Sequence, residues 1–374
     1  MIRAIRDREN IIFCALFTYL VATSFINQDV YAFTVRFASV VIFVVLGVLA
    51  IPYLAEHIRD RDPDLYMLLL LPVLTLIFAL MSGSGLGAVF IPTDLALICY
   101  VTRYLRLTKK AVLYLSFVGA CPVSLWYSHV RWSYNFNMVG FVFMLMAFFA
   151  MILVETVELK YKRQLEFMVY ITAFILSVLY HTRTAITGII AFGIFFLMRR
   201  LIVRNKRVCT ALIMISTLGS VLFTLMYTVL SDYMYNAVVL NKNIFSGRED
   251  IWTELWMAFL ASPLTGTGSR YVMKSFEIFE VHNGMFDILV VHGAVVFIIT
   301  LTMLVRMLLR ACKALRTGAD EQIGFISICA VFAMLISAFT ENFFIVPPYS
   351  LFFMAFIEIA IADKKETFDE TKEA

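Results

Sequence analysis

Six ionisable side chains near the ends of apolar segments carry the chemistry that this sequence offers. An arginine guanidinium stays charged at any working pH and presents fixed N–H donors that match phosphate oxygens. A histidine beside such groups moves a proton near neutral pH. We therefore expect these residues to converge on one cavity that takes a phosphate-bearing ligand. They are Arg36, Arg131, Arg183, Arg248, His282 and Glu341.

Membrane-spanning helices are the elements that must position these side chains. Hydrophobic residues make up 61% of the 374 residues and charged residues only 16%, whereas soluble domains have roughly 45–50% and about 25%. This composition excludes a soluble enzyme, and also disordered, collagen-like and disulfide-rich proteins. Because backbone polar groups must be satisfied inside lipid, the apolar segments are predicted to be helices.

Apolar segments long enough to approach a membrane span, which needs about 20 residues, recur along the whole chain. We expect an all-α, polytopic integral membrane protein with about 12 transmembrane helices in a single domain, 1–374. Two of the segments, 184–198 and 349–362, are short. The segments are 10–26, 32–55, 65–82, 86–104, 111–128, 138–156, 165–181, 184–198, 208–230, 284–305, 322–340 and 349–362.

The distribution of positive residues predicts the orientation of these spans, because Lys and Arg are in excess on the cytoplasmic side. With both termini placed in the cytoplasm, 24 of the 31 Lys and Arg residues fall in cytoplasmic segments and 6 in outer ones. Arg36 lies within a span. This bias predicts a multi-pass protein with Arg183, Arg248 and His282 on the outer side of the membrane, and a charged, disordered cytoplasmic tail, 363–374.

One outer connection, 231–283, is about fifty residues long, whereas the others are short. Long loops that are not disordered are usually functional. Ser246 and Glu249 have the spacing of a capping box, with Ser246 at the N-cap. Trp252, Leu255, Trp256 and Phe259 then recur at helical spacing. We expect an amphipathic helix from Gly247 to about Ala261, near the outer membrane–water boundary.

The residues after this predicted helix form two further patterns. Pro263 ends the helix, and Gly266 and Gly268 predict a tight turn. His282 and Asn283 directly precede the tenth apolar segment. The sequence contains no HExxH pattern or other cluster of metal ligands, so we expect no metal site.

These patterns occur in an order that resembles the signature region of the O-antigen ligase and polymerase superfamily. The strong match covers about 246–293 and consists of Ser246-Gly247-Arg248, Trp252, Pro263, Gly266-Thr267-Gly268, His282-Asn283 and Gly293. The segment His181-Thr182-Arg183-Thr184-Ala185 is similar to an earlier Ser-Arg turn of the family, with Thr182 in place of the usual Ser. Thr340-Glu341-Asn342 is similar to a weaker, late acidic feature.

The resemblance implies a bacterial glycosyltransferase of the inner (plasma) membrane, with its active site facing the periplasm or outside. Such enzymes use a glycan carried on undecaprenyl pyrophosphate, and they generally need neither nucleotide sugars nor metals. We therefore expect no cofactor. The expected partners are the lipid-linked oligosaccharide, the bilayer and a chain-length regulator, and no nucleic acid is expected.

The residue types fit this chemistry. As the bond from the sugar to the lipid pyrophosphate breaks, negative charge grows on the leaving group, and Arg183 and Arg248 are expected to stabilise it. His282 is expected to accept the proton of the attacking hydroxyl. The expected substrate-binding or positioning residues are Arg131, Arg36, Asn283, Glu341, Trp252, Gly266 and Gly268, with Trp252 favoured as an anchor for its helix.

Three functions stay open on the sequence alone. A polymerase, which passes the growing chain to the non-reducing end of a lipid-linked repeat unit, is favoured because nothing points to another acceptor. A ligase would pass the glycan to lipid A core or a related acceptor. A transporter of the lipid-linked saccharide would need charges spread through the bilayer centre and often shows internal repeats, neither of which is evident. The sugar and its linkage are not encoded in any pattern we recognise.

Overall fold

The computed structural model describes most of the chain, and every structural statement below refers to these residues: 2–24, 28–121, 136–157, 159–234, 238–239, 242–243, 247–274, 281–317 and 321–362. The side chain of Arg36 lies outside the described residues, as do Arg131, Ser246 and the predicted tail 363–374.

The described chain is almost entirely helical, which confirms the all-α prediction. The helices are α1 (Ile2–Ser24), α2 (Gln28–Arg59), α3 (Pro63–Met81), α4 (Phe90–Val101), α5 (Lys109–Ala120), α7 (Phe136–Thr156), α8 (Lys162–Leu179), α9 (Arg183–Leu197), α10 (Arg199–Arg204), α11 (Lys206–Met234), α12 (Arg248–Ala261), α13 (Gly284–Thr317), α14 (Glu321–Ser337) and α15 (Tyr349–Ile361). Two 3₁₀ turns are η1 (Leu86–Val89) and η2 (Phe343–Ile345), and two short strands, β1 (Val238–Val239) and β2 (Lys242–Asn243), pair antiparallel.

Each of the twelve predicted apolar segments overlaps a helix. By length and composition, five stretches within these helices could cross a membrane: 37–59 in α2, 63–81 in α3, 137–156 in α7, 206–230 in α11 and 284–316 in α13. Four shorter apolar helical stretches are 86–101, 183–197, 322–337 and 349–361. These features support a membrane protein, while the number of twelve spans stays a prediction.

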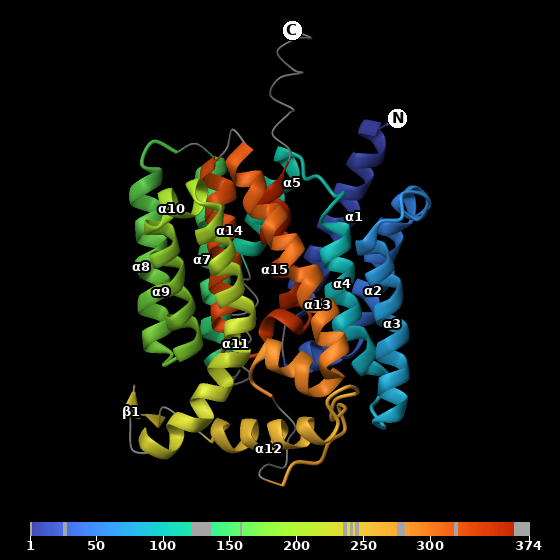
Figure 1. Ribbon diagram of the computed structural model, residues 1–374. Helices are drawn as coiled ribbons and strands as arrows, with labels where there is room; N and C mark the ends of the chain where they lie inside the picture. Colours follow the sequence, from blue (N-terminus) through green and yellow to red (C-terminus); the bar gives the residue numbers. More distant parts are fainter. Residues whose placement is uncertain are drawn as a thin grey trace.

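The long helices run side by side, and α12 lies across one end of the bundle (Figure 1). The short helix α10 lies toward the opposite end, next to the ends of α8 and α9 (Figure 1). The face of α12 that packs onto the bundle carries Ile251, Trp252, Leu255 and Phe259, all buried. This placement explains the helical spacing of apolar residues that the sequence shows in this segment.

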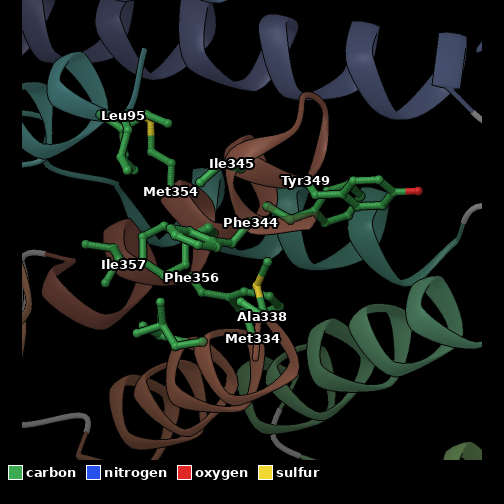
Figure 2. Packing of buried hydrophobic residues seen from close by; sticks show 14 of the residues in the cluster. Leu95, Met334, Ala338, Phe344, Ile345, Tyr349, Met354, Phe356 and Ile357 are labelled. Atoms are coloured by element: carbon green, nitrogen blue, oxygen red, sulfur yellow. The ribbon is translucent and has the colours of Figure 1, made fainter. Parts of the chain in front are cut away.

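Helix α15 forms the centre of the bundle, since every residue from Tyr349 to Ala360 is buried. A helix that is apolar on all sides belongs in the interior. Figure 2 shows Phe344, Met354 and Phe356 among side chains from neighbouring segments, including Leu95 of α4 and Met334 of α14. The short apolar segment at the C-terminal end of the sequence is therefore a core helix of this bundle.

Five charged side chains at the end opposite α12 form what we name the aspartate cluster. It consists of Asp62, Asp64, Arg103, Arg306 and Arg310. Asp64 is 2% exposed and forms ion pairs with Arg103 at 3.0 Å, Arg306 at 2.6 Å and Arg310 at 2.8 Å. Helix α13 extends to Thr317, well past the predicted end at 305, and two of the charged residues beyond that end, Arg306 and Arg310, have this buried carboxylate as a partner.

Candidate functional site

Glu341 joins two residues that the sequence singled out for chemistry. Its Oε1 accepts a hydrogen bond from Arg248 Nη2 at 2.7 Å, and its Oε2 lies 3.2 Å from His282 Nδ1. The Glu341 side chain is 8% exposed, while those of Arg248 and His282 are 17% and 25% exposed. A buried carboxylate thus holds a guanidinium and an imidazole that both still reach the surface.

Arg183 lies close to this group, at the start of α9 and just before the predicted span 184–198. Burial, and next the positive charge of Arg248, lower the pKa of the Arg183 guanidinium, whereas Tyr227 and Glu341 oppose this shift. Arg183 is therefore within electrostatic reach of both members of the Arg248–Glu341 pair. We name Arg183, Arg248, His282 and Glu341 the glutamate cluster.

Contacts between α9 and the end of α14 bring Arg183 and Glu341 together. The hydroxyl of Ser337 donates to the backbone carbonyl of Thr184 at 3.2 Å, and the hydroxyls of Thr184 and Thr340 are 3.1 Å apart. Each contact joins a residue next to an ionisable one. The pairing of these short segments therefore fixes where the two charges lie.

His282 has a backbone φ of 53°, a left-handed conformation that costs about 1–2 kcal/mol for a residue with a Cβ. Its neighbour Asn283 is fully buried. The Asn283 side-chain amide donates to the Thr224 hydroxyl at 2.9 Å and to the Phe339 carbonyl at 3.0 Å, and its oxygen accepts from the Phe286 amide at 3.0 Å. These bonds fix the Asn283 side chain directly after His282, and a positioning role for Asn283 stays a prediction.

Arg248 is the first residue of α12, which begins one residue later than predicted. The N-cap is Gly247, with a φ of 80° and no side-chain hydrogen bond at the cap. The predicted capping box, with Ser246 at the N-cap, is therefore wrong, because the chain turns into the helix at the glycine. Asp250 and Glu249 lie in the first turn, where the helix dipole favours negative charge.

Trp252 is fully buried, and its Nε1 donates to the carbonyl of Val281 at 2.6 Å. Its ring packs edge-on against Tyr227 of α11, with ring centroids 4.9 Å apart. This hydrogen bond ties α12 to the residue just before His282. Trp252 therefore has no exposed surface on which a sugar could stack, and its role as an anchor for α12 stays a prediction with which this burial is consistent.

The turn with Gly266 and Gly268 packs against α13 at the point where that helix is broken, and the contact is made by backbone atoms. At Gly293 the helix adopts a φ of 85° and a ψ of 167°. The amide of Thr267 donates to the Val290 carbonyl at 2.7 Å, and the amide of Gly268 donates to the Val291 carbonyl at 3.1 Å. The loop therefore supplies donors for carbonyls at the point where the helix is broken.

Glycine is required on both sides of this contact. A Cβ on Gly266 would lie 2.4 Å from the Val291 carbonyl oxygen, and a Cβ on Gly293 would lie 2.1 Å from the Leu264 carbonyl oxygen. Both glycines also have positive φ values. The three glycines that the sequence singled out thus belong to one backbone junction that connects the end of α12 to α13.

Two of the predicted site residues are not placed with the others. Arg131 and the side chain of Arg36 lie outside the described residues, so their convergence on the site stays a prediction. Tyr227, in contrast, adjoins the site and was missed by the sequence analysis. Its signal was weak, because a tyrosine near the end of an apolar segment is typical of any membrane boundary.

The described residues contain no group of three or more His, Cys, Asp or Glu side chains that could hold a metal ion. That the reaction needs no metal stays a prediction. What the glutamate cluster offers is positive charge from two arginines, one carboxylate and one imidazole. Such a set can bind a phosphate-bearing group and transfer a proton.

The chain was compared with protein families and with curated proteins. The O-antigen ligase family matches residues 168–301, a stretch that includes Arg183, Arg248 and His282. No curated protein matches the chain. The family match confirms the resemblance seen in the sequence, and over residues 168–301 the chain is similar to the O-antigen ligase and polymerase superfamily, whose members are membrane glycosyltransferase-like enzymes.

Proposed function

We propose that this protein is a polymerase of bacterial surface polysaccharide that acts at the outer face of the plasma membrane. Its donor is a glycan on undecaprenyl pyrophosphate, and its acceptor is the non-reducing end of a lipid-linked repeat unit. The observation that carries this proposal is the glutamate cluster, which joins Arg248 and His282 through Glu341 and places Arg183 beside them.

The arginines bind the leaving group. Arg183 and Arg248 together exceed the single negative charge of Glu341, so the cluster is net positive before substrate binds. The bond between the donor sugar C1 and the pyrophosphate oxygen breaks, and the electron pair stays on that oxygen. Fixed cations near this oxygen stabilise the charge as it develops, which lowers the barrier more than it strengthens ground-state binding.

His282 takes the proton from the acceptor. A carboxylate only accepts hydrogen bonds, so the imidazole presents its Nδ1–H to Glu341, and Nε2 is the basic nitrogen. The acceptor hydroxyl oxygen forms a bond with C1 while its proton moves to Nε2. Glu341 orients the ring and stabilises the imidazolium, a role that carboxylates play beside catalytic histidines.

The decisive experiment is a transfer assay with purified protein in liposomes. The substrate is an undecaprenyl-pyrophosphate-linked repeat unit, and the products are separated by size. We expect a ladder of longer lipid-linked glycans from the wild type, and its loss in Arg183→Ala, Arg248→Ala and His282→Ala. Arg270→Ala is the matched control, because Arg270 is an exposed arginine near Gly85 that makes no ion pair with any described residue.

A second candidate is a ligase, because the matched family is described as O-antigen ligase. A ligase would give no ladder with the repeat unit alone, and would transfer the glycan once lipid A core is supplied. If the three variants match the wild type in both assays, the glutamate cluster is not the active site, whichever acceptor is used.

The proposed side of the membrane has its own test. Lys274 is exposed in the loop after α12, and Lys274→Cys provides a label site in a variant whose native cysteines are replaced. A membrane-impermeant maleimide should label it in spheroplasts with no need for permeabilisation. Labelling that occurs only after permeabilisation would place α12 in the cytoplasm and contradict the proposal.

A further inference from the structure

Several positive side chains at the end of the bundle opposite α12 have acidic partners among the described residues. Arg103, Arg306 and Arg310 pair with Asp64 in the aspartate cluster. Farther round the bundle, Lys162 and Arg163 pair with Glu155 at 2.6 Å and 2.9 Å. These cations are held by the fold itself, so they are poorly suited to an external anion.

The turn from α10 to α11 differs, because it places four cations around one cavity without an acid. The cavity has a volume of about 650 Å³ and is lined by Arg200, Leu201, Arg204, Asn205, Lys206 and Arg207. All six are exposed. Where the structure describes the chain, none of the four cations forms an ion pair. We name this the basic cavity.

The charge of the basic cavity comes from side chains. The Asn205 side-chain oxygen already accepts a hydrogen bond from the Arg207 amide at 2.9 Å, which caps the start of α11. A guanidinium binds phosphate oxygens in a bidentate geometry, and lysine adds a point charge. Four unpaired cations around one cavity therefore match a phosphate-bearing anion.

An apolar cavity opens a short distance away along the chain. It has a volume of about 570 Å³ and lies between α8 and α9. Its lining is mainly apolar, with Phe167, Ile194 and Leu197 among its residues, and also includes the ion-paired Arg163 and Glu166. Leu197 is 87% exposed and is only three residues before Arg200, so the two cavities lie close together. An apolar cavity next to a basic one fits an amphipathic ligand better than a free anion.

We infer that the two cavities form a binding site for an anionic glycerophospholipid of the surrounding membrane. The phosphate headgroup binds Arg200, Arg204 and the first residues of α11, and an acyl chain lies along the apolar cavity. Basic pockets between membrane helices are a known mode of recognition for anionic headgroups. This site is at the end opposite the glutamate cluster, and it does not depend on the proposed reaction.

The test is lipid binding by the purified protein in a neutral detergent, followed by native mass spectrometry. Dioleoylphosphatidylglycerol is titrated into wild type and into Arg200→Gln/Arg204→Gln. Since each cation near an anionic headgroup contributes substantially to binding, the double variant should bind roughly 10- to 30-fold more weakly. Lys109→Gln/Lys313→Gln is the matched control, because it removes two exposed cations that line neither cavity.

Two further arms separate the sources of phosphate. Dioleoylphosphatidylcholine should bind much more weakly, and inorganic phosphate at equal concentration should not displace phosphatidylglycerol. Equal affinity in the double variant, equal binding of both lipids, or displacement by phosphate would each overturn the inference. If Arg200→Gln/Arg204→Gln does not fold, Lys206→Gln/Arg207→Gln tests the other wall of the basic cavity with the same expected loss.

Discussion

The glutamate cluster and the aspartate cluster both join charged residues from distant parts of the chain, but they distribute charge differently. In the aspartate cluster, the single carboxylate of Asp64 pairs with three arginines. In the glutamate cluster, each oxygen of Glu341 faces one partner, and one of these is a histidine.

The difference teaches which ion-pair network serves the fold and which can serve a reaction. Arg306 and Arg310 come from α13, Arg103 lies in the turn after α4, and all three meet a carboxylate on α3, so the aspartate cluster ties that turn and α13 to α3. The glutamate cluster instead contains a group that can exchange a proton, held in a left-handed conformation. Such strained conformations persist where the surroundings impose them and are concentrated at functional sites.

The largest expected effect is on transfer by His282→Asn. Asparagine tolerates the left-handed conformation but cannot act as the base, so the rate of glycan transfer should fall by roughly 10²- to 10⁴-fold. The melting temperature should stay close to that of the wild type. His181→Asn is the control, because His181 is an exposed histidine at the same end with a φ of 51°. Similar losses in both variants would remove the distinction that we draw for His282.

The next effect tests how tightly the turn after α12 packs against the break in α13. Gly293→Ala forces a Cβ against the Leu264 carbonyl oxygen at a positive φ, which should cost about 2–4 kcal/mol of unfolding free energy. We also expect faster proteolysis after α12. Gly47→Ala, at a helical site with open space around it, should be neutral or stabilising by up to about 1 kcal/mol. Equal stability of the two variants would show that the α13 junction is not tightly packed.

A third substitution tests whether the aspartate cluster serves the fold and not the reaction. Asp64→Asn removes the carboxylate that Arg103, Arg306 and Arg310 share, while Arg103 keeps Asp62 as a partner. Since the three arginines are partly exposed, the expected loss is about 1–3 kcal/mol of unfolding free energy. Thermal melting of the purified protein measures this loss. Transfer per folded molecule should stay near that of the wild type. A strong loss of transfer with normal melting would mean that the aspartate cluster also takes part in the reaction.

The smallest effect is a pH dependence from Asp62, in the turn between α2 and α3. Burial favours a higher pKa for Asp62, but the Asp64 amide hydrogen bond and the charge of Arg103 outweigh it, so the pKa lies below its ordinary value. A carboxyl with a lowered pKa contributes stability above its unfolded pKa, and this is lost as the pH falls through the folded value. Melting temperatures between about pH 6 and 3 should therefore fall less steeply in Asp62→Asn. Identical slopes would contradict this assignment.

Part of the site was predictable from local patterns. The helical spacing that includes Trp252 and Phe259 predicted α12 and its buried face, and the glycines at 266 and 268 predicted the turn after it. The start of α12 was misassigned because Ser246 and Glu249 have capping-box spacing, yet Gly247 occupies the cap. Nothing local showed that Gly293 would meet this turn, since that contact joins two segments through their backbones.

The sequence by itself determined the all-α class, the places of the apolar helices and the residue types able to bind phosphate and move a proton. These follow from composition and short-range periodicity, which act within one or two helical turns. Only the tertiary structure decided that Glu341 bridges Arg248 and His282, which are 93 and 59 residues away from it in the chain. Contacts at such separations depend on how the helices pack. Helix packing cannot be deduced from the spacing of residues within any single segment.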